Sequence, residues 1–405
     1  MANAPVPTEF DPSRFDHLPR TRLVFGNKTV EQVGELCREY GAGKVLLVTD
    51  PGIVRAGHAA HVIDSLNAAG VPLAIYDQVR ENPTTKDVAR CLAVARSEQI
   101  DFIVGLGGGS SLDTAKGCNF LLTNGGEMKD YWGIGKASQP MLPLIAIPTT
   151  AGTGSECQSF ALIADEHSHL KMACGDPKAA AKVAILDPTL SVSLPRAVTA
   201  NTGIDAVAHA VETAVTRKRN PLSLMYSREA FRLCVKSLPV VLREPSNITA
   251  RGEMLLGAAY AGTAIENSML GAAHSAANPL TAHFNVVHGT SVGMMLPLVV
   301  RYNAQNEAAL HGYAELASAP EIATVSGGLH AALEALISRL ETLLNLADLP
   351  RSLDELGVKA ETIPTMAGEA AKQWTAHFNP HPIGEADFVE LYGRAFDRRS
   401  DGDMV

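Results

Sequence analysis

Short apolar runs alternate with amphipathic segments along the first half of the chain. The runs have the length and composition of buried strands and lie at residues 45–49, 72–76, 102–106 and 142–147, with an extra edge strand expected at 21–26. Helical periodicity occupies residues near 56–70, 86–98 and 111–122. Continuous apolar strands separated by helices predict a parallel sheet with helices on both faces.

The pattern changes after about residue 195. From residue 199 onward, long Ala- and Leu-rich amphipathic segments follow one another, with few β-branched runs. A length of 405 residues favours two domains over one. We therefore expect an α/β domain over residues 1–195, an all-α domain over residues 196–405, and an active site in the cleft between them.

Composition limits the class of protein. Apolar residues make up 46% of the chain and charged residues 19%, which is typical of a globular protein. The formal net charge is −9 and no dense basic run occurs, so no nucleic-acid partner is expected. No stretch approaches the ~18 apolar residues of a membrane span, and the start Met-Ala-Asn-Ala-Pro lacks the parts of a secretory signal. We therefore expect a cytoplasmic protein whose six scattered cysteines are buried, reduced thiols.

A glycine-rich turn follows the third of these buried strands. Residues 102–116 read FIVGLGGGSSLDTAK, in which Gly107, Gly108, Gly109 and Ser110 lead into a predicted helix. Glycines let a ligand approach the backbone closely, and the free amides at a helix N-terminus favour an anion, so we expect a pyrophosphate site here. Asp113 stands at capping-box spacing from Ser110. Lys116 is interpreted as either a surface residue or a phosphate or ribose contact, and a tight turn without a ligand is the alternative for the whole loop.

Two further strand ends carry small polar residues. Residues 148–156 read PTTAGTGSE, and Thr149, Thr150 and Thr153 are candidates for hydrogen bonds to a cofactor, although an ordinary turn would look the same. Asp50 ends the strand in VLLVTD. An acid there favours NAD over NADP because it binds the ribose hydroxyls and repels a 2′-phosphate, but aspartate is also a common turn residue.

Acidic and imidazole side chains recur in the second half. Asp205 and His209 are four residues apart on a predicted helix, about 6 Å along its axis and on one face. His274, His283 and His288 lie in a stretch of apolar and small residues. On one straight helix, His274 and His288 would be about 21 Å apart, so a shared ion requires a chain break, for which Pro279 and Asn285 are candidates.

One carboxylate and three imidazoles form a mixed nitrogen and oxygen ligand set. Such a set suits Fe(II), Zn(II) or a neighbouring divalent ion, and leaves room for a substrate oxygen. Any single histidine here is commonly structural. The four residues Asp205, His209, His274 and His288 together favour a metal site because they accompany a nucleotide loop.

Four motifs stand in order along the chain: GGGSSLDTAK, PTTAGTGSE, TGIDAVAHAVE and HSAANPLTAHFNVVHG. Together they resemble the iron-containing (group III) metal-dependent alcohol dehydrogenase family, and the similarity runs from RLVFGNKTVEQVGEL near the start to NPHPIGEADFVELYGRAF near the end. The resemblance implies a nucleotide-binding α/β domain, a helical domain and a homodimer or larger homo-oligomer. It also implies metal ligands at Asp205, His209, His274 and His288, pyrophosphate contacts at Gly107, Gly108, Gly109, Ser110 and Asp113, nicotinamide contacts at Thr149, Thr150 and Thr153, NAD preference at Asp50, and a cofactor-contacting Lys171.

One position departs from the family pattern. Many members carry a second histidine four residues after the third ligand, and this chain has Asn278 there. An amide is no general acid or base near neutral pH. His283 either takes over the proton relay or faces a helix neighbour in a structural role.

The predicted activity is NAD(P)-linked and metal-dependent. It would interconvert a small alcohol and its aldehyde or ketone by moving a hydride between nicotinamide C4 and a metal-bound alcohol or carbonyl. One alternative is a dehydroquinate-synthase-like or glycerol-dehydrogenase-like enzyme with a polyol substrate. The other is a non-catalytic assembly subunit that keeps the fold.

Overall fold

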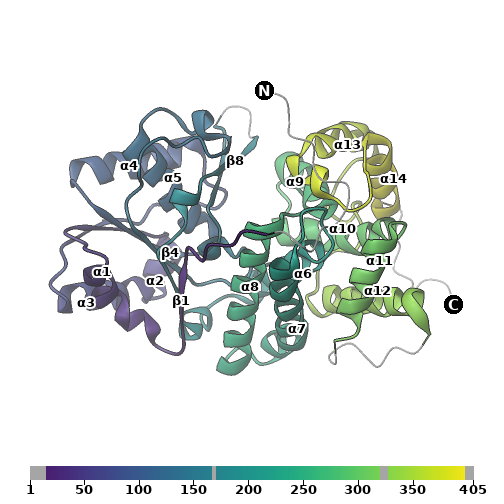
Figure 1. The fold of residues 1–405 in the computed structure, drawn as a ribbon, viewed down its shortest axis with the longest axis horizontal. Helices are drawn as coiled ribbons and strands as arrows, with labels where there is room; N and C mark the ends of the chain where they lie inside the picture. Colours follow the sequence, from purple (N-terminus) through teal and green to yellow (C-terminus); the bar gives the residue numbers. More distant parts are fainter. Residues whose placement is uncertain (1–14, 167–169, 320–326, 397–405) are drawn as a thin grey trace. The chain divides into compact units, whose positions relative to one another are not determined.

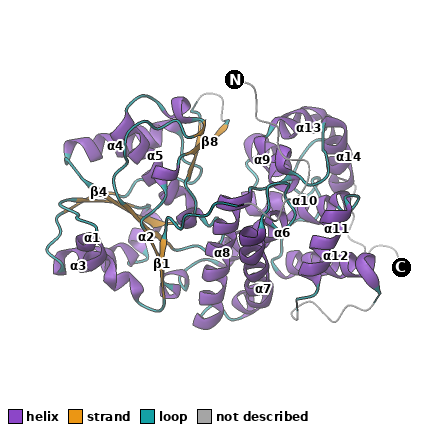
Figure 2. Ribbon diagram, viewed as in Figure 1, coloured by secondary structure: helices purple, strands orange, loops and turns teal. Residues whose placement is uncertain are grey.

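The computed structural model describes residues 15–166, 170–319 and 327–396. The described residues form two compact units, one spanning Leu18–Leu194 and the other formed by those from Pro195 onward together with those just before Leu18 (Figure 1). Strands occur in the first of these units, and the described residues of the second are helices and loops (Figure 2). The start Met-Ala-Asn-Ala-Pro, on which the expectation about a secretory signal depends, lies outside the described residues.

The α/β unit is built on a six-stranded sheet in the order β1-β9-β6-β4-β2-β3, with every neighbouring pair parallel. The sequence prediction is confirmed for five strands: β1 (Arg22–Phe25) at the sheet edge, β2 (Val45–Val48), β3 (Leu73–Tyr76), β4 (Phe102–Gly107) and β6 (Leu144–Pro148). The missed strand is β9 (Val183–Leu186), which lies between β1 and β6. It is only four residues long and follows an alanine-rich segment, so its apolar run carries a weak strand signal.

Side chains alternate between the two faces of this sheet and enter two separate cores. Leu47 and Val104 pack with residues of α1 (Val33–Glu39) and α3 (His58–Ala68) on one face. Leu46 and Ile103 pack on the other face with residues of α4 (Thr85–Ser97) and α5 (Gly109–Asn124). Because both faces are covered, the strands are apolar throughout, as the sequence predicted.

A second, smaller sheet was not predicted. It has the order β5-β8-β7, with β5 (Gly133–Ile134), β7 (Phe160–Ala164) and β8 (Lys171–Gly175). The β7–β8 pair is antiparallel. The α/β unit therefore contains an antiparallel pair in addition to the predicted parallel sheet. The two longer strands read FALIA and KMACG, and their alanines and small residues hide the usual β-branched signal.

The second unit is helical, as predicted. Its described helices are α6 (Arg196–Thr213), α7 (Pro221–Arg243), α8 (Ile248–Ser268), α9 (Ala272–Phe284), α10 (His288–Asn303), α11 (Glu307–Ala317), α12 (Gly328–Leu346), α13 (Ile363–Lys372) and α14 (Glu385–Phe396). Helix α6 packs against α7, α8 and α10, and α9 packs against α10 and α13. Most of α6 is therefore buried, and a polar side chain on it requires a partner.

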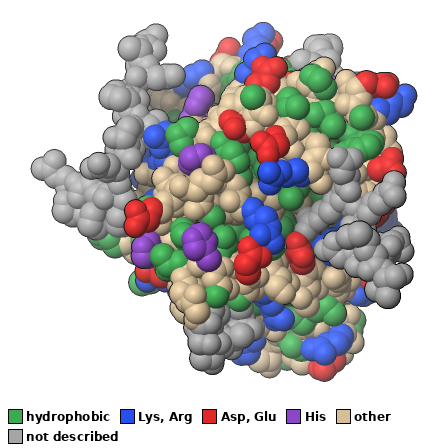
Figure 3. All heavy atoms as spheres, turned by 90° about the vertical axis from the view of Figure 1, so that its right-hand side faces the viewer, with side chains coloured by type: hydrophobic (Ala, Val, Ile, Leu, Met, Phe, Trp, Pro, Cys, Tyr) green, Lys and Arg blue, Asp and Glu red, His purple; other side chains and the backbone are tan. Residues whose placement is uncertain are grey.

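The charged surface, the hydropathy of the helices and the state of the cysteines can each be compared with the composition of the chain. On the face of the helical unit shown in Figure 3, basic and acidic side chains of the described residues are interspersed, with no broad basic patch. Among the helices that the structure describes, none combines the length and the apolar character needed to cross a membrane. All six cysteines are buried free thiols, which confirms that prediction.

Candidate metal centre and cofactor loops

Helix α6 presents two of the predicted metal ligands from one face. Asp205 and His209 are one turn apart, and their side chains are 7% and 5% exposed. His209 Nε2 lies 3.5 Å from Asp205 Oδ1. The i, i+4 spacing therefore brings the two groups together in the interior of the helical unit.

A break in the chain brings in the other two histidines. Helix α9 ends at Phe284, Asn285 takes a left-handed conformation with φ 53°, and α10 begins at His288. Pro279 lies inside α9 without ending it, so the break is at Asn285. His274 Nε2 and His288 Nε2 lie 3.4 and 4.0 Å from Asp205 Oδ1.

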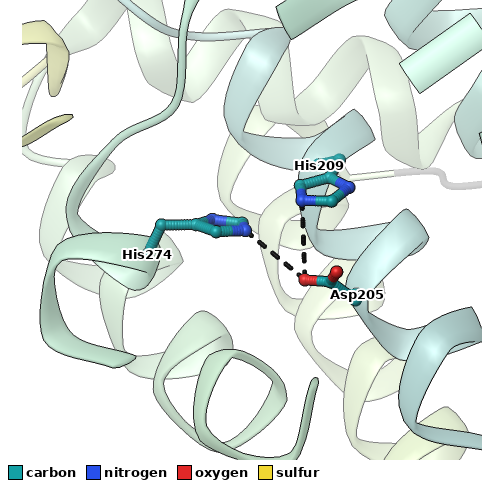
Figure 4. Close-up of side chains that lie close together, drawn as sticks. All are labelled: Asp205, His209 and His274. Atoms are coloured by element: carbon teal, nitrogen blue, oxygen red, sulfur yellow. Dashed lines mark ion pairs between the residues drawn. The ribbon is translucent and has the colours of Figure 1, made fainter. Parts of the chain in front are cut away.

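Three imidazole nitrogens thus lie around one oxygen of the Asp205 carboxylate. Figure 4 shows His209, on the same helix as Asp205, and His274, on another helix, both directed at Asp205 Oδ1. The ring of His274 stacks on that of His209 with 4.7 Å between centroids and lies 5.4 Å from that of His288. The ligand atoms of the buried Asp205, His209 and His274 lie within 4.8 Å of one another, whereas His288, whose side chain is 27% exposed, lies outside this compact group.

The donor atoms fit a divalent cation. Asp205 Oδ1 and His274 Nε2 are buried and have no hydrogen-bond partner among the described residues. Buried polar atoms without partners are costly, and these two point at each other across 3.4 Å. A cation held by one carboxylate oxygen and three imidazole nitrogens would satisfy them with a common ligand set for iron or zinc.

Charge in the cluster is strongly coupled. Burial would raise the pKa of the Asp205 carboxyl, but the neighbouring histidines hold it well below its usual range. Burial would lower the pKa of the His274 imidazole, but the adjacent Glu212 and Asp205 carboxylates raise it to about 9. The cluster is therefore a place where positive charge is strongly favoured.

Glu212 is a site residue that the sequence reasoning missed. It is 3% exposed on α6, and its Oε2 accepts a hydrogen bond of 2.5 Å from His274 Nδ1. An available signal is its spacing of three residues from His209 and seven from Asp205, which puts all three on one face of α6.

The remaining histidine and the departing amide have partners of their own. His283 Nε2 lies 2.8 Å from Glu369 Oε2, and its side chain is 42% exposed. Asn278 Nδ2 donates to Gln373 Oε1 at 3.1 Å. The structure therefore pairs His283 with a surface carboxylate and not with the four-residue cluster.

The predicted phosphate loop follows β4. Gly107 has φ +144°, a conformation that side chains rarely adopt, and Gly108 caps α5, which begins at Gly109. The predicted capping box of Ser110 and Asp113 is wrong, because the helix starts earlier and both residues lie inside it. At the start of this helix the amides of Ser111 and Leu112 donate to Gly108 O, which leaves the amides of Gly109 and Ser110 available to an anion.

The second loop packs directly against the first. Thr149 N donates to Gly107 O at 3.0 Å, because β4 and β6 are parallel neighbours whose carboxyl ends meet at one sheet edge. A Cβ on Gly109 would lie 2.8 Å from Thr153 Cγ2, and one on Gly108 would lie 3.4 Å from Thr150 Oγ1. Thr149 Oγ1 is buried without a hydrogen-bond partner among the described residues. The predicted pyrophosphate and nicotinamide residues therefore form one surface.

Asp50 joins the same sheet edge from β2. Its Oδ1 caps α2 (Pro51–Arg55) by accepting from the amides of Gly52 and Ile53 at 2.8 and 3.1 Å. Its Oδ2 accepts from Ser111 Oγ at 3.4 Å, beside the glycine loop. The turn role foreseen for Asp50 is therefore present, and its second oxygen faces the proposed dinucleotide loop.

Lys116 fits neither predicted role. It is fully buried, and its Nζ donates to the carbonyl oxygens of Ser155, Gln158 and Phe160 at 2.5, 2.8 and 3.0 Å and to Ser155 Oγ at 2.9 Å. Ser155 Oγ in turn donates to Asp113 Oδ1 at 2.8 Å. Burial raises the pKa of the Asp113 carboxyl, an effect opposed by the charges of Lys116 and, more weakly, Lys171. The Lys116 side chain thus links α5 to the second loop through these hydrogen bonds.

Replacing Lys116 by Met is expected to destabilise the fold by about 3 kcal/mol, because buried acceptors lose their donor. The measurement is the free energy of unfolding in urea. Lys44→Met is the matched control, since Lys44 forms an exposed pair with Glu98 and should cost less than about 1 kcal/mol. Equal losses in the two variants would contradict this role for Lys116.

Glu156 gives the fold a pH dependence. It is buried in the second loop, its Oε1 has no hydrogen-bond partner among the described residues, and burial raises its pKa from 4.5 to about 7. The folded state therefore holds this proton more tightly than the unfolded state, so stability falls as the pH rises from about 4.5 to about 7. Glu156→Gln removes this fall, and unfolding in urea should show a gain relative to wild type that is larger at pH 8 than at pH 5 by about 3 kcal/mol. A gain independent of pH would contradict the assignment.

Comparison with known proteins identifies the family of the chain. Residues 19–188 match the family "Iron-containing alcohol dehydrogenase", and residues 199–396 match "Fe-containing alcohol dehydrogenase family, C-terminal". The 1,3-propanediol dehydrogenase of Klebsiella pneumoniae is 34% identical over 94% of this chain and 99% of its own length. The NAD-dependent methanol dehydrogenase of Bacillus methanolicus is 34% identical over 92% of this chain and 97% of its own length.

A solved structure gives the same result for the fold. The crystal structure of a 1,3-propanediol oxidoreductase has a TM-score of 0.91 and 33% identity, and the match covers 95% of this chain and all of that one. The two family matches together cover the α/β part and the helical part of the chain. Each of the two relatives covers both parts in one alignment. The chain belongs to the iron-containing alcohol dehydrogenase family and is an oxidoreductase that acts on CH–OH groups.

Proposed function

We propose that this chain is an NAD-dependent, divalent-metal-dependent alcohol dehydrogenase or aldehyde reductase for small alcohols and carbonyl compounds. The observation that carries the proposal is the arrangement of three imidazole nitrogens within 3.4 to 4.0 Å of Asp205 Oδ1. In this proposal Asp205, His209, His274 and His288 hold the ion, and Fe(II) is favoured over Zn(II) by the family.

The cofactor proposal is supported by the sheet edge of the α/β unit. Gly107, Gly108, Gly109 and Ser110 would contact the pyrophosphate, and Thr149, Thr150, Thr153 and Lys171 would lie on the nicotinamide side. Asp50 beside the loop favours NAD over NADP, because its charge would repel a 2′-phosphate. A relative named as an NAD-dependent enzyme agrees with this choice.

When bound, the cation would supply Lewis-acid polarisation of the substrate C–O bond and the nicotinamide would exchange the hydride. The chain's own residues fix the geometry of that exchange. The four ligands define where the substrate oxygen can bind, and the packed glycine and threonine loops define where the dinucleotide can bind. Asn278 does not move protons and His283 pairs with Glu369 outside the cluster, so in this proposal solvent carries the proton.

Further parts of the proposal concern organisation. We propose domains at residues 1–195 and 196–405, a cytoplasmic location, and assembly into a homodimer or larger homo-oligomer. The activity needs both parts of the chain, because the metal ligands belong to the helical unit and the dinucleotide loops to the α/β unit.

The proposed function is tested by following NADH absorbance with purified protein and a panel of primary alcohols, diols and aldehydes. We expect oxidation of at least one small alcohol with NAD, and weaker turnover with NADP. Absence of any alcohol-dependent NADH formation in metal-loaded protein would contradict the proposal. Turnover confined to phosphorylated polyols would favour the dehydroquinate-synthase-like alternative instead.

A further inference from the structure

Glu212 makes three hydrogen bonds from a buried position beside the proposed metal site. Its Oε2 accepts from His274 Nδ1 at 2.5 Å and from Gly271 N at 3.2 Å, and its Oε1 accepts from Ala273 N at 2.7 Å. The side chain is only 3% exposed. A carboxylate buried to this degree requires strong partners, and these three donors supply them.

The same carboxylate caps the helix that carries His274. Gly271 precedes α9 and has no side chain to cap it, so the amides of Gly271 and Ala273 turn to Glu212 on α6. A negative charge at a helix N-terminus is stabilising, which adds to these bonds. Glu212 therefore fixes the start of α9 and the ring of its third residue together.

Close approach at Gly271 makes this arrangement possible. A Cβ there would lie 3.1 Å from Glu212 Oε1 and 3.0 Å from Asn379 Oδ1. Asn379 Oδ1 accepts from Ala272 N at 3.1 Å, so the first amides of α9 are shared between two side chains. Only the Glu212 side chain also reaches an imidazole of the metal cluster.

We propose that Glu212 is a positioning residue that holds His274 with Nδ1 protonated and Nε2 directed at the metal, and that it thereby raises the affinity of the site for a divalent cation. This inference rests on the proposed function, because it requires the cluster to bind a metal. An ionised carboxylate only accepts hydrogen bonds, so Nδ1 must donate and Nε2 is left to face Asp205 Oδ1 at 3.4 Å. Such a partner also strengthens the imidazole as a ligand.

The test measures Zn(II) affinity of metal-free protein by competition with a chromophoric chelator, without any assay of turnover. Glu212→Gln keeps the shape but replaces one acceptor by a donor and removes the charge, and we expect ~10- to 100-fold weaker binding. Ser275→Ala is the matched control. Its hydroxyl is buried in the same first turns of α9, and its hydrogen-bond partners, Gly271 O at 3.0 Å and Thr375 Oγ1 at 2.7 Å, are not proposed metal ligands. We expect Ser275→Ala to bind zinc within about threefold of wild type.

The possible outcomes distinguish a failure of the role of Glu212 from a failure of the proposed metal site. If Glu212→Gln binds zinc as tightly as Ser275→Ala while both fold, by circular dichroism, the role of Glu212 is overturned and the proposed function stands. If wild type binds no zinc, the metal site itself fails and both proposals fail with it.

A second measurement keeps the inference testable if Glu212→Gln does not fold. In zinc-loaded wild type, nitrogen-15 NMR of the His274 ring should show a proton on Nδ1 and zinc on Nε2. Coordination through Nδ1 would overturn the proposal.

Discussion

Replacing Asp205 by Asn is expected to abolish metal binding and to lower kcat/KM for alcohol oxidation by at least ~1000-fold, which corresponds to about 4 kcal/mol. Asp205 Oδ1 is the oxygen around which the nitrogens of His209, His274 and His288 gather. Asparagine has nearly the same shape, so the loss would come from the missing charge. Metal content by mass spectrometry and NADH formation with a primary alcohol measure the two effects.

Glu369→Gln is the matched control for this prediction. It also removes the charge of a carboxylate that contacts a histidine, because Glu369 lies 2.8 Å from His283 at the surface. We expect full metal content and nearly unchanged turnover in this variant. An Asp205→Asn protein that keeps one metal per chain, or a Glu369→Gln protein that loses its metal, would contradict the assignment of ligands.

Replacing Gly108 by Ala is expected to weaken NADH binding by at least ~10-fold without a loss of stability. Gly108 has φ −77° and ψ −173°, which alanine adopts freely, and its new Cβ would make only an ordinary contact of 3.4 Å with Thr150. The protein itself therefore tolerates the methyl group. A pyrophosphate resting on the backbone would not, because it needs close approach at this residue. Fluorescence titration with NADH and thermal unfolding measure the two quantities.

The neighbouring Gly107 provides the contrast. Its φ of +144° and the 2.5 Å approach of a Cβ to Ser111 Oγ mean that Gly107→Ala should destabilise the fold by about 1 to 3 kcal/mol. Gly393→Ala, in α14 with open space around it, should be neutral or stabilising. Unchanged NADH affinity in Gly108→Ala would remove the pyrophosphate from this loop.

Much of the fold could be predicted because its signals are local. The strands that end at Gly107 and Pro148 are continuous apolar runs bounded by glycine or proline, and their length and composition are visible without the structure. Strand β9 and the β7–β8 hairpin were missed because their short, alanine-containing runs become strands only through pairing with distant residues. Pairing across the sequence leaves no local pattern.

The candidate site likewise contains residues that local sequence patterns predict and residues that they do not. The pair Asp205 and His209 follows from helical spacing. Of the two candidate breaks that the sequence offered, Pro279 and Asn285, the second is the one that brings in His288. Glu212 and Lys116 were missed or misread because each acts on backbone groups from elsewhere in the sequence, at the start of α9 and in the second loop. Which buried polar groups become partners depends on which helices and loops pack together, and a single sequence carries no direct signal of that packing.

The central claim is that one divalent ion, held by Asp205 and three histidines, is required for alcohol oxidation linked to NAD. Its most direct test is the rate of NADH formation while Fe(II) is titrated, under anaerobic conditions, into protein stripped by a chelator. We expect no turnover in stripped protein and a linear return of activity that ends at one equivalent of iron per chain. Full turnover in stripped protein that contains no detectable metal would contradict it.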